Sequence, residues 1–180
     1  MIWQALTAAD KGLAASGDTD TEFLENIRIA LARLDKGIHI GSWGQLQEWK
    51  VDKDDPSDTH RHLSHLVGLF PGSALASYDP VVQGPVPTNG SMVKYTKEQV
   101  LEAAKTSLTH RGNGTAADAD SGWEKAWRAA SYAQLGDSQN FYHLLSVRLV
   151  TFLMIIFQML SYGFEVLHQE KLCCQLILDL

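Results

Sequence analysis

The side chains best suited to chemistry gather between Gly41 and Gly72. Carboxylates act as general acids or bases, Arg and His donate hydrogen bonds to hydroxyl groups, and Trp faces stack on the apolar side of a sugar ring. This combination predicts a carbohydrate site, whereas the plainer alternative is a solvated acidic loop whose histidines cap a helix. The residues concerned are Trp43, Glu48, Trp49, Lys50, Asp52, Lys53, Asp54, Asp55, Asp58, His60, Arg61, His62 and His65.

The spacing of His60, His62 and His65 offers a metal site as a rival interpretation. Alternate residues of an extended loop face one side, and hydrolytic zinc sites keep three such ligands and an open position. Against this, Leu63 and Ser64 stand where further carboxylate ligands are expected. We therefore assign no metal and no other cofactor. A small metal-dependent hydrolase, or a sugar-binding protein that uses the three histidines, stays as the alternative function.

A second polar region follows, RGNGTAADADSGWEKAW from Arg111 to Trp127. It is no phosphate loop, because it lacks GxxxxGK[ST] and a preceding strand. Trp123 and Trp127 are four apart, so they share a helix face, and we expect them in the core rather than on a ligand platform. Glu124 is expected to be a solvated carboxylate at the start of that helix.

Helical periodicity dominates the segments that must position these residues. It predicts helices over about 2–13, 23–34, 63–70, 100–108 and 121–135, and another from about residue 137. Residues 71–94 carry proline-bearing turns and are predicted to be a long loop, and no segment shows the sustained alternation of a strand. We predict an all-α chain with at least two antiparallel helical hairpins and its chemistry in the loops.

Charge and composition narrow the function classes. The 180 residues carry a formal net charge of −6 and are 45% hydrophobic and 20% charged, which is typical of a folded domain. We expect no nucleic-acid or membrane partner, because both need clustered positive charge. The adjacent Cys173 and Cys174 form no disulfide framework. The opening MIWQALTAAD lacks the pattern of a secretory leader, and no localisation is assigned.

Composition changes at residue 147. Residues 147–180 are strongly apolar and contain no proline. Their uncharged part, 149–164, is shorter than the about 20 apolar residues of a membrane span. A buried helix or strand pair and a segment not selected for folding remain as interpretations. We expect this tail to pack poorly on the rest of the chain.

Three strings in order, GQLQEW, HRHLSHLVGLFPG and RGNGTAADADSGWEKAW, closely resemble the C-terminal half of the catalytic domain of glycoside hydrolase family 95. The family consists mainly of α-L-fucosidases, and the form SGWEKAWR is most similar to fungal members. The resemblance covers about Ile2 to Ser146. It implies that residues 1–146 belong to an (α/α)6 barrel of the six-hairpin glycosidase type, and that 147–180 are a non-family tail, typical of intron-derived or frame-shifted sequence.

The resemblance also implies roles for single residues. Arg61 and His62 match the adjacent Arg-His that contacts the bound sugar in the family, so the expected partner is a fucosylated glycan or a related sugar. The family inverts configuration with a Glu acid and with an Asn pair and an Asp that activate water, a variation on two-carboxylate hydrolysis. The strings that carry those groups do not occur here. We therefore assign no catalytic residue and expect a truncated, inactive piece. Four further residues match the motifs without an assigned role: Glu48, Trp49, His60 and His65.

Overall fold

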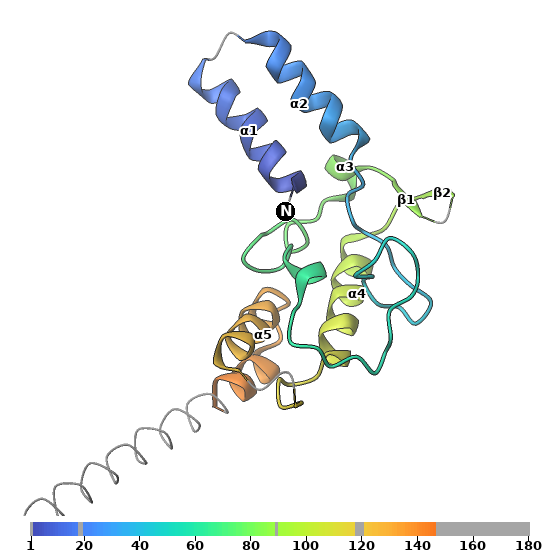
Figure 1. Cartoon of the computed structure of the whole chain (residues 1–180), viewed down its shortest axis with the longest axis vertical. Coiled ribbons are helices and arrows are strands. Elements are labelled where there is room, and N and C mark those ends of the chain that lie inside the picture. The colour runs from blue at the N-terminus through green and yellow to red at the C-terminus, as the bar shows by residue number, and fades with distance from the viewer. Residues whose placement is uncertain (1, 18–19, 89, 118–120, 147–180) are drawn as a thin grey trace, which may run out of the picture.

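The computed structural model describes residues 2–17, 20–88, 90–117 and 121–146, and these are mostly helical (Figure 1). The all-α prediction is confirmed in this outline, and within the described ranges strands occur only in one short hairpin. The domain boundary and the packing predicted for 147–180 lie outside the described residues. Within the described part no helix is long and apolar enough to cross a membrane.

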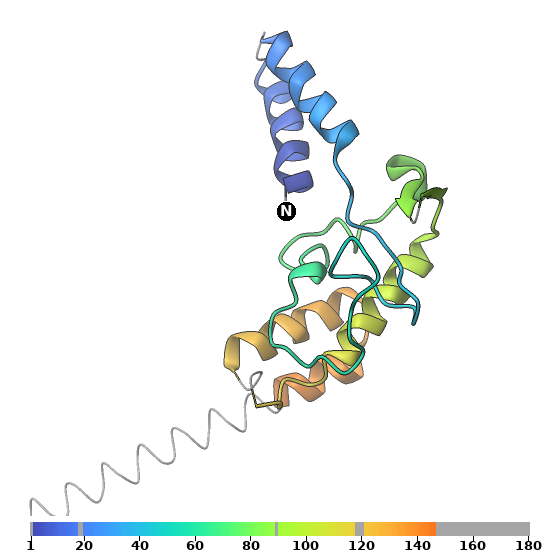
Figure 2. The same cartoon turned by 45° about the vertical axis from the view of Figure 1, so that its right-hand side comes forward.

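An antiparallel pair of helices forms one end of the molecule (Figures 1 and 2). Helix α1 spans Ile2–Ser16 and helix α2 spans Thr21–Arg33. Asp20 caps α2 by accepting a hydrogen bond from the Phe23 backbone N–H at 2.9 Å. The two helices are also joined by an ion pair between Arg28 and Asp10. Both predicted helices are confirmed.

The long segment between α2 and α3 is mostly irregular, and the helix predicted over residues 63–70 is wrong in extent. Only the single 3-10 turn η1, Ser64–Leu66, forms there. The chain folds back instead, and the backbone N–H of Leu75 donates to the carbonyl of Gly68 at 2.8 Å. A Cβ at Gly68 would lie 2.7 Å from Leu75 Cγ, so the return of the chain needs glycine there. Tertiary contact has overridden the helical spacing of the leucines.

Residues 71–94 are more ordered than the predicted loop. They contain helix α3, Pro80–Gln83, and an antiparallel hairpin of β1, Val86–Thr88, and β2, Ser91–Val93. Gly90 adopts a φ of 78° in the connecting turn, which favours glycine. The strands are too short for alternation to be detected in the sequence, and this explains why none was predicted.

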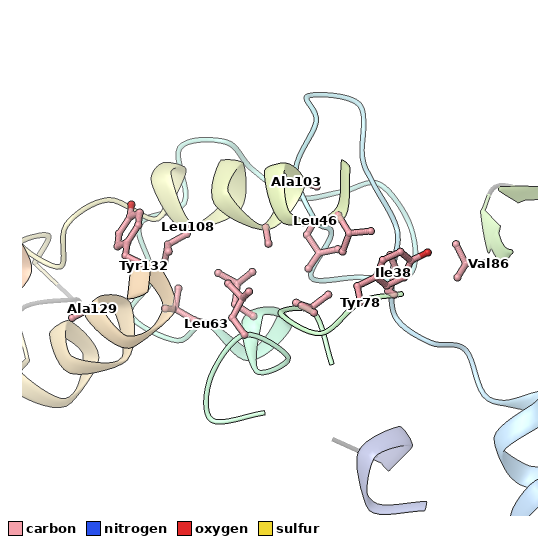
Figure 3. Packing of buried hydrophobic residues seen from close by; sticks show 14 of the residues in the cluster. Ile38, Leu46, Leu63, Tyr78, Val86, Ala103, Leu108, Ala129 and Tyr132 are labelled. Carbon is pink, nitrogen blue, oxygen red and sulfur yellow. The ribbon is translucent and has the colours of Figure 1, made fainter. Parts of the chain in front are cut away.

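Two further helices, both predicted from their apolar periodicity, border the core. Helix α4 spans Lys97–His110 and α5 spans Gly122–Gln134, and residues 138–146 are also helical. Leu63 packs between α4 and α5, while Val86 marks the far end of the cluster (Figure 3). The irregular segment therefore supplies the middle layer of the core.

We predict that Thr96→Ala lowers the free energy of unfolding by about 1 kcal/mol, because Thr96 caps α4. Its side chain accepts from the Gln99 backbone N–H, and the Gln99 side chain accepts from the Thr96 backbone N–H at 2.8 Å, which is a capping box. Urea unfolding followed by circular dichroism measures the change. Thr96→Ser keeps the hydroxyl and is expected to retain most of the stability; an equal loss in both variants would contradict the capping role.

Candidate functional site

The segment that carries Glu48 is fixed on helix α4. The backbone N–H of Leu46 donates to the carbonyl of Ala103 at 3.0 Å, and the Ser107 hydroxyl donates to the carbonyl of Leu46 at 2.8 Å. Leu46 and Ser107 are buried, so these hydrogen bonds are protected from water. Glu48 follows two residues later and lies beside the residue after α4, Arg111.

Arg111 joins three parts of the candidate site. Its guanidinium binds the Glu48 carboxylate at 2.5 Å and the Asp58 carboxylate at 3.2 Å. The other terminal nitrogen donates to the backbone carbonyls of His60 and His62, each at 3.3 Å. The Arg111 side chain is only 9% exposed, so these charge-assisted hydrogen bonds are shielded from solvent. One buried charge therefore sets the path of the chain from residue 58 to 62.

His65 faces the Glu48 carboxylate from the interior of the protein. Its side chain is 4% exposed, and Nδ1 lies 3.9 Å from Glu48 Oε2 and has no hydrogen-bond partner. Burial and, to a smaller extent, the positive charge of Arg111 together lower the pKa of His65 to about 4, against an opposing effect of the Asp58 carboxylate. The imidazole is therefore neutral at pH 7. His65 and Glu48 both line a cavity of about 220 Å³ that also borders Trp3 and Lys36.

Arg61 and His62, predicted to contact sugar, are both exposed. The ring of His62 is hydrogen-bonded to that of His60, with Nδ1 and Nε2 2.7 Å apart. Trp49 is 51% exposed, and the ammonium of Lys53 lies 4.0 Å from its ring centroid. The structure thus brings residues 60–62, which we call the HRH segment, to one surface. Trp49 faces a lysine instead of that segment.

The three histidines do not converge as a metal site. In the described ranges, no group of three or more His, Cys, Asp or Glu side chains lies close enough to hold a metal ion. His60 and His62 bond to each other, while His65 is buried against Glu48. This geometry gives no support to the metal-dependent alternative.

Glu124 is not the solvated carboxylate that we predicted. It is fully buried and forms an ion pair with Arg128, which is also fully buried, one turn later in α5. Arg128 donates to the carbonyl of Gly112 at 3.1 Å, and a Cβ at Gly114 would lie 2.7 Å from the Glu124 carboxylate. The pair therefore holds in place the glycine loop, residues 112–114, that follows Arg111. The i, i+4 spacing of Glu124 and Arg128 was the signal available in the sequence.

Of the two tryptophans of α5, Trp123 differs from the prediction and Trp127 agrees with it in part. Trp123 is 47% exposed, so its placement in the core is wrong. Trp127 is partly buried against the core, and its Nε1 donates to the carbonyl of Phe70 at 2.6 Å. Trp123 is on the first turn of α5, where its ring lies 5.3 Å from that of His62. The segment HRHLSHLVGLFPG and the segment RGNGTAADADSGWEKAW therefore meet at His62 and Trp123.

Comparison with known proteins identifies the family of the chain. The profile of the glycosyl hydrolase family 95 catalytic domain matches residues 1–160. The chain belongs to this family. The catalytic domain of the family is an (α/α)6 barrel, which is consistent with the mostly helical structure. The match continues beyond Ser146, the predicted end of the resemblance.

Among its relatives, the chain is 40% identical to a probable α-fucosidase A of Aspergillus niger over 147 residues, which is 82% of this chain and 16% of the relative. It is also 40% identical to a probable α-fucosidase A of Aspergillus oryzae, over 81% of this chain and 18% of that protein. An α-L-fucosidase 2 of Arabidopsis thaliana is 29% identical over 72% of the chain and 13% of its own length. The chain thus spans less than a fifth of the length of these curated relatives.

We predict that acid destabilises the fold through His65. An unfolded histidine binds a proton below about pH 6.5, whereas folded His65 does so only near pH 4. The free energy of unfolding therefore falls by about 2 kcal/mol between pH 7 and pH 5 through this group alone. Urea unfolding at both pH values measures the fall. We expect it to shrink in His65→Gln and to persist in a matched variant of an exposed histidine, His143→Gln; equal falls in both variants would refute the prediction.

We predict that Glu124→Gln lowers the free energy of unfolding by about 3–5 kcal/mol, because it leaves the charge of Arg128 unpaired in the interior. Glu25→Gln, at an exposed position of α2, is the matched control and should change it by less than about 0.5 kcal/mol. Replacing both partners, as Glu124→Leu with Arg128→Met, should recover part of the loss. A loss below about 1 kcal/mol in Glu124→Gln would contradict the bracing role of the pair.

Proposed function

We propose that the chain is a sugar-binding part of an α-L-fucosidase catalytic domain, that Arg61 and His62 contact the terminal α-L-fucosyl residue of a glycan, and that these 180 residues alone do not hydrolyse it. Residues 1–146 form part of the (α/α)6 barrel in this proposal. Membership of family 95 supports the activity class, and all three relatives named above are described as fucosidases. The complete domain hydrolyses the linkage with inversion.

The observation that carries the proposal is the way Arg111 holds the HRH segment. It binds the carbonyls of His60 and His62 from the inside, and both Arg61 and His62 have their side chains exposed. Arg and His donors can bind the hydroxyl groups of a pyranose. Because the backbone on both sides of Arg61 is already fixed, less conformational freedom is lost when the sugar binds.

The carboxylates of the acidic stretch support the lack of turnover. Inverting hydrolysis needs a proton donor on the leaving oxygen and an activated water on the opposite face of the ring. Here the carboxylates are engaged within the protein, and Glu48 is bound by Arg111. The other acceptors take backbone N–H groups of their own loop: Asp52 from Ser42 at 2.7 Å, Asp54 from Glu48 at 3.0 Å, Asp55 from Ser57 at 2.8 Å and Asp58 from His60 at 2.9 Å.

Two measurements test the proposal on the purified 180-residue chain. We expect no hydrolysis of an aryl α-L-fucoside, because each missing acid or base step removes typically 10²–10⁴-fold in rate. We expect millimolar binding of L-fucose by saturation-transfer NMR, weakened about 10-fold or more in Arg61→Ala/His62→Ala, since each lost hydrogen bond is worth about 0.5–1.5 kcal/mol.

The control is Arg33→Ala/His143→Ala, which removes the same two residue types at exposed positions elsewhere. It should bind L-fucose like the unmodified chain. Unchanged binding in the Arg61/His62 variant would overturn the assigned contacts. Turnover that disappears in that variant would overturn the lack of catalysis and would require an acid and a base within these residues.

A further inference from the structure

Aromatic rings form a continuous row from the HRH segment to helix α5, and we call these four residues the aromatic row: His60, His62, Trp123 and Trp127. Successive ring centroids are 4.8 Å, 5.3 Å and 6.3 Å apart. The first two residues come from the irregular segment and the last two from the first turns of α5, about sixty positions later in the chain. The row is therefore a product of the tertiary fold.

Both ends of the row are fixed in place. Trp127 donates from Nε1 to the carbonyl of Phe70, and with Val67 and Pro71 it lines an apolar cavity of about 240 Å³. At the other end, Arg111 binds the backbone carbonyls of His60 and His62. Trp123 lies between these supports and is still 47% exposed. A large flat side chain with an open surface and fixed neighbours loses little freedom when a ligand stacks on it.

The surroundings of Trp123 favour a sugar over an apolar partner. A pyranose presents C–H groups on its faces and hydroxyl groups at its edge, so it needs an aromatic surface next to polar donors. Trp123 contacts the ring of His62, and Arg61 precedes His62 in the chain. The exposed apolar residues of the helical pair, such as Ile2 and Phe23, lie on other elements of the chain, α1 and α2.

From this juxtaposition we infer that Trp123 stacks on the second sugar ring of a fucosylated glycan, the ring to which the terminal fucose is attached. The inference rests on the proposed contact of Arg61 and His62 with fucose. Trp123 lies one ring along the aromatic row from His62, with Trp127 behind it as a support. It is thus a residue that determines which glycans bind, and it leaves the fucosyl contacts to the HRH segment.

The test compares two ligands on the 180-residue chain by saturation-transfer NMR: L-fucose and an α-L-fucosyl-galactose disaccharide. We expect Trp123→Ala to weaken binding of the disaccharide by about 3- to 10-fold, the range of aromatic stacking, and to leave L-fucose within about 2-fold. Trp123→Phe keeps a flat ring and should retain most of the affinity. Phe23→Ala is the matched control, because Phe23 is a similarly exposed aromatic residue on a different element, α2. It should change neither ligand.

The outcomes separate this inference from the proposed function. Equal weakening of both ligands in Trp123→Ala, or no weakening of either, overturns the second-ring contact while Arg61→Ala/His62→Ala still reports on fucose. Disaccharide binding that depends on Trp123 but not on Arg61 and His62 overturns the fucose contacts and keeps the stacking surface. If neither ligand binds the unmodified chain, the fucose contacts and the second-ring contact are both overturned. Circular dichroism of each variant identifies a loss of folding. If Trp123→Ala does not fold, the affinity of Trp123→Phe for the disaccharide tests the stacking contact instead.

Discussion

The guanidinium of Arg111 is the interaction on which the candidate site depends. It lies directly after α4 and binds Glu48, Asp58 and two backbone carbonyls of the HRH segment. These partners lie in a segment with little regular structure, so side-chain hydrogen bonds rather than a helix or strand hold its backbone. Because the Arg111 side chain is almost fully buried, its hydrogen bonds are not in competition with water. A rigid helix end thus fixes an irregular surface.

A second arginine supports the first from the other side. Arg128 and Glu124 form a fully buried ion pair in α5, and Arg128 holds the carbonyl of Gly112, the residue after Arg111. A buried pair of this kind is costly to desolvate and contributes less to stability than to a defined geometry. Here the pair fixes the position of α5 relative to the residue after Arg111. The N-terminal turn of α5, with Trp123, is placed against the segment that Arg111 holds.

The sequence predicted what depends on local patterns and missed what depends on contacts far along the chain. Helices α1, α2, α4 and α5 follow apolar spacing of 3.6 residues and have recognisable ends, so they could be found. The 3-10 turn at Ser64–Leu66 replaces a predicted helix because Leu75 returns to pack on Gly68. The burial of Glu124 depends on the glycine loop that packs on it, and its spacing to Arg128 was the local signal for it. The contact of Trp123 with His62, about sixty positions earlier in the chain, had no local signal.

The two interpretations of the acidic stretch concern different side chains of the same loop. The carboxylates from Asp52 to Asp58 accept backbone N–H groups of that loop, as a purely structural acidic loop requires. Arg61 and His62 extend from the fixed backbone into solvent, as a ligand-binding loop requires. The carboxylates thus help to fold the segment, while Arg61 and His62 present hydrogen-bond donors to solvent. A neutral, hydroxyl-rich ligand suits that surface, because hydrogen-bond donors and ring faces recognise it without a charge on the ligand.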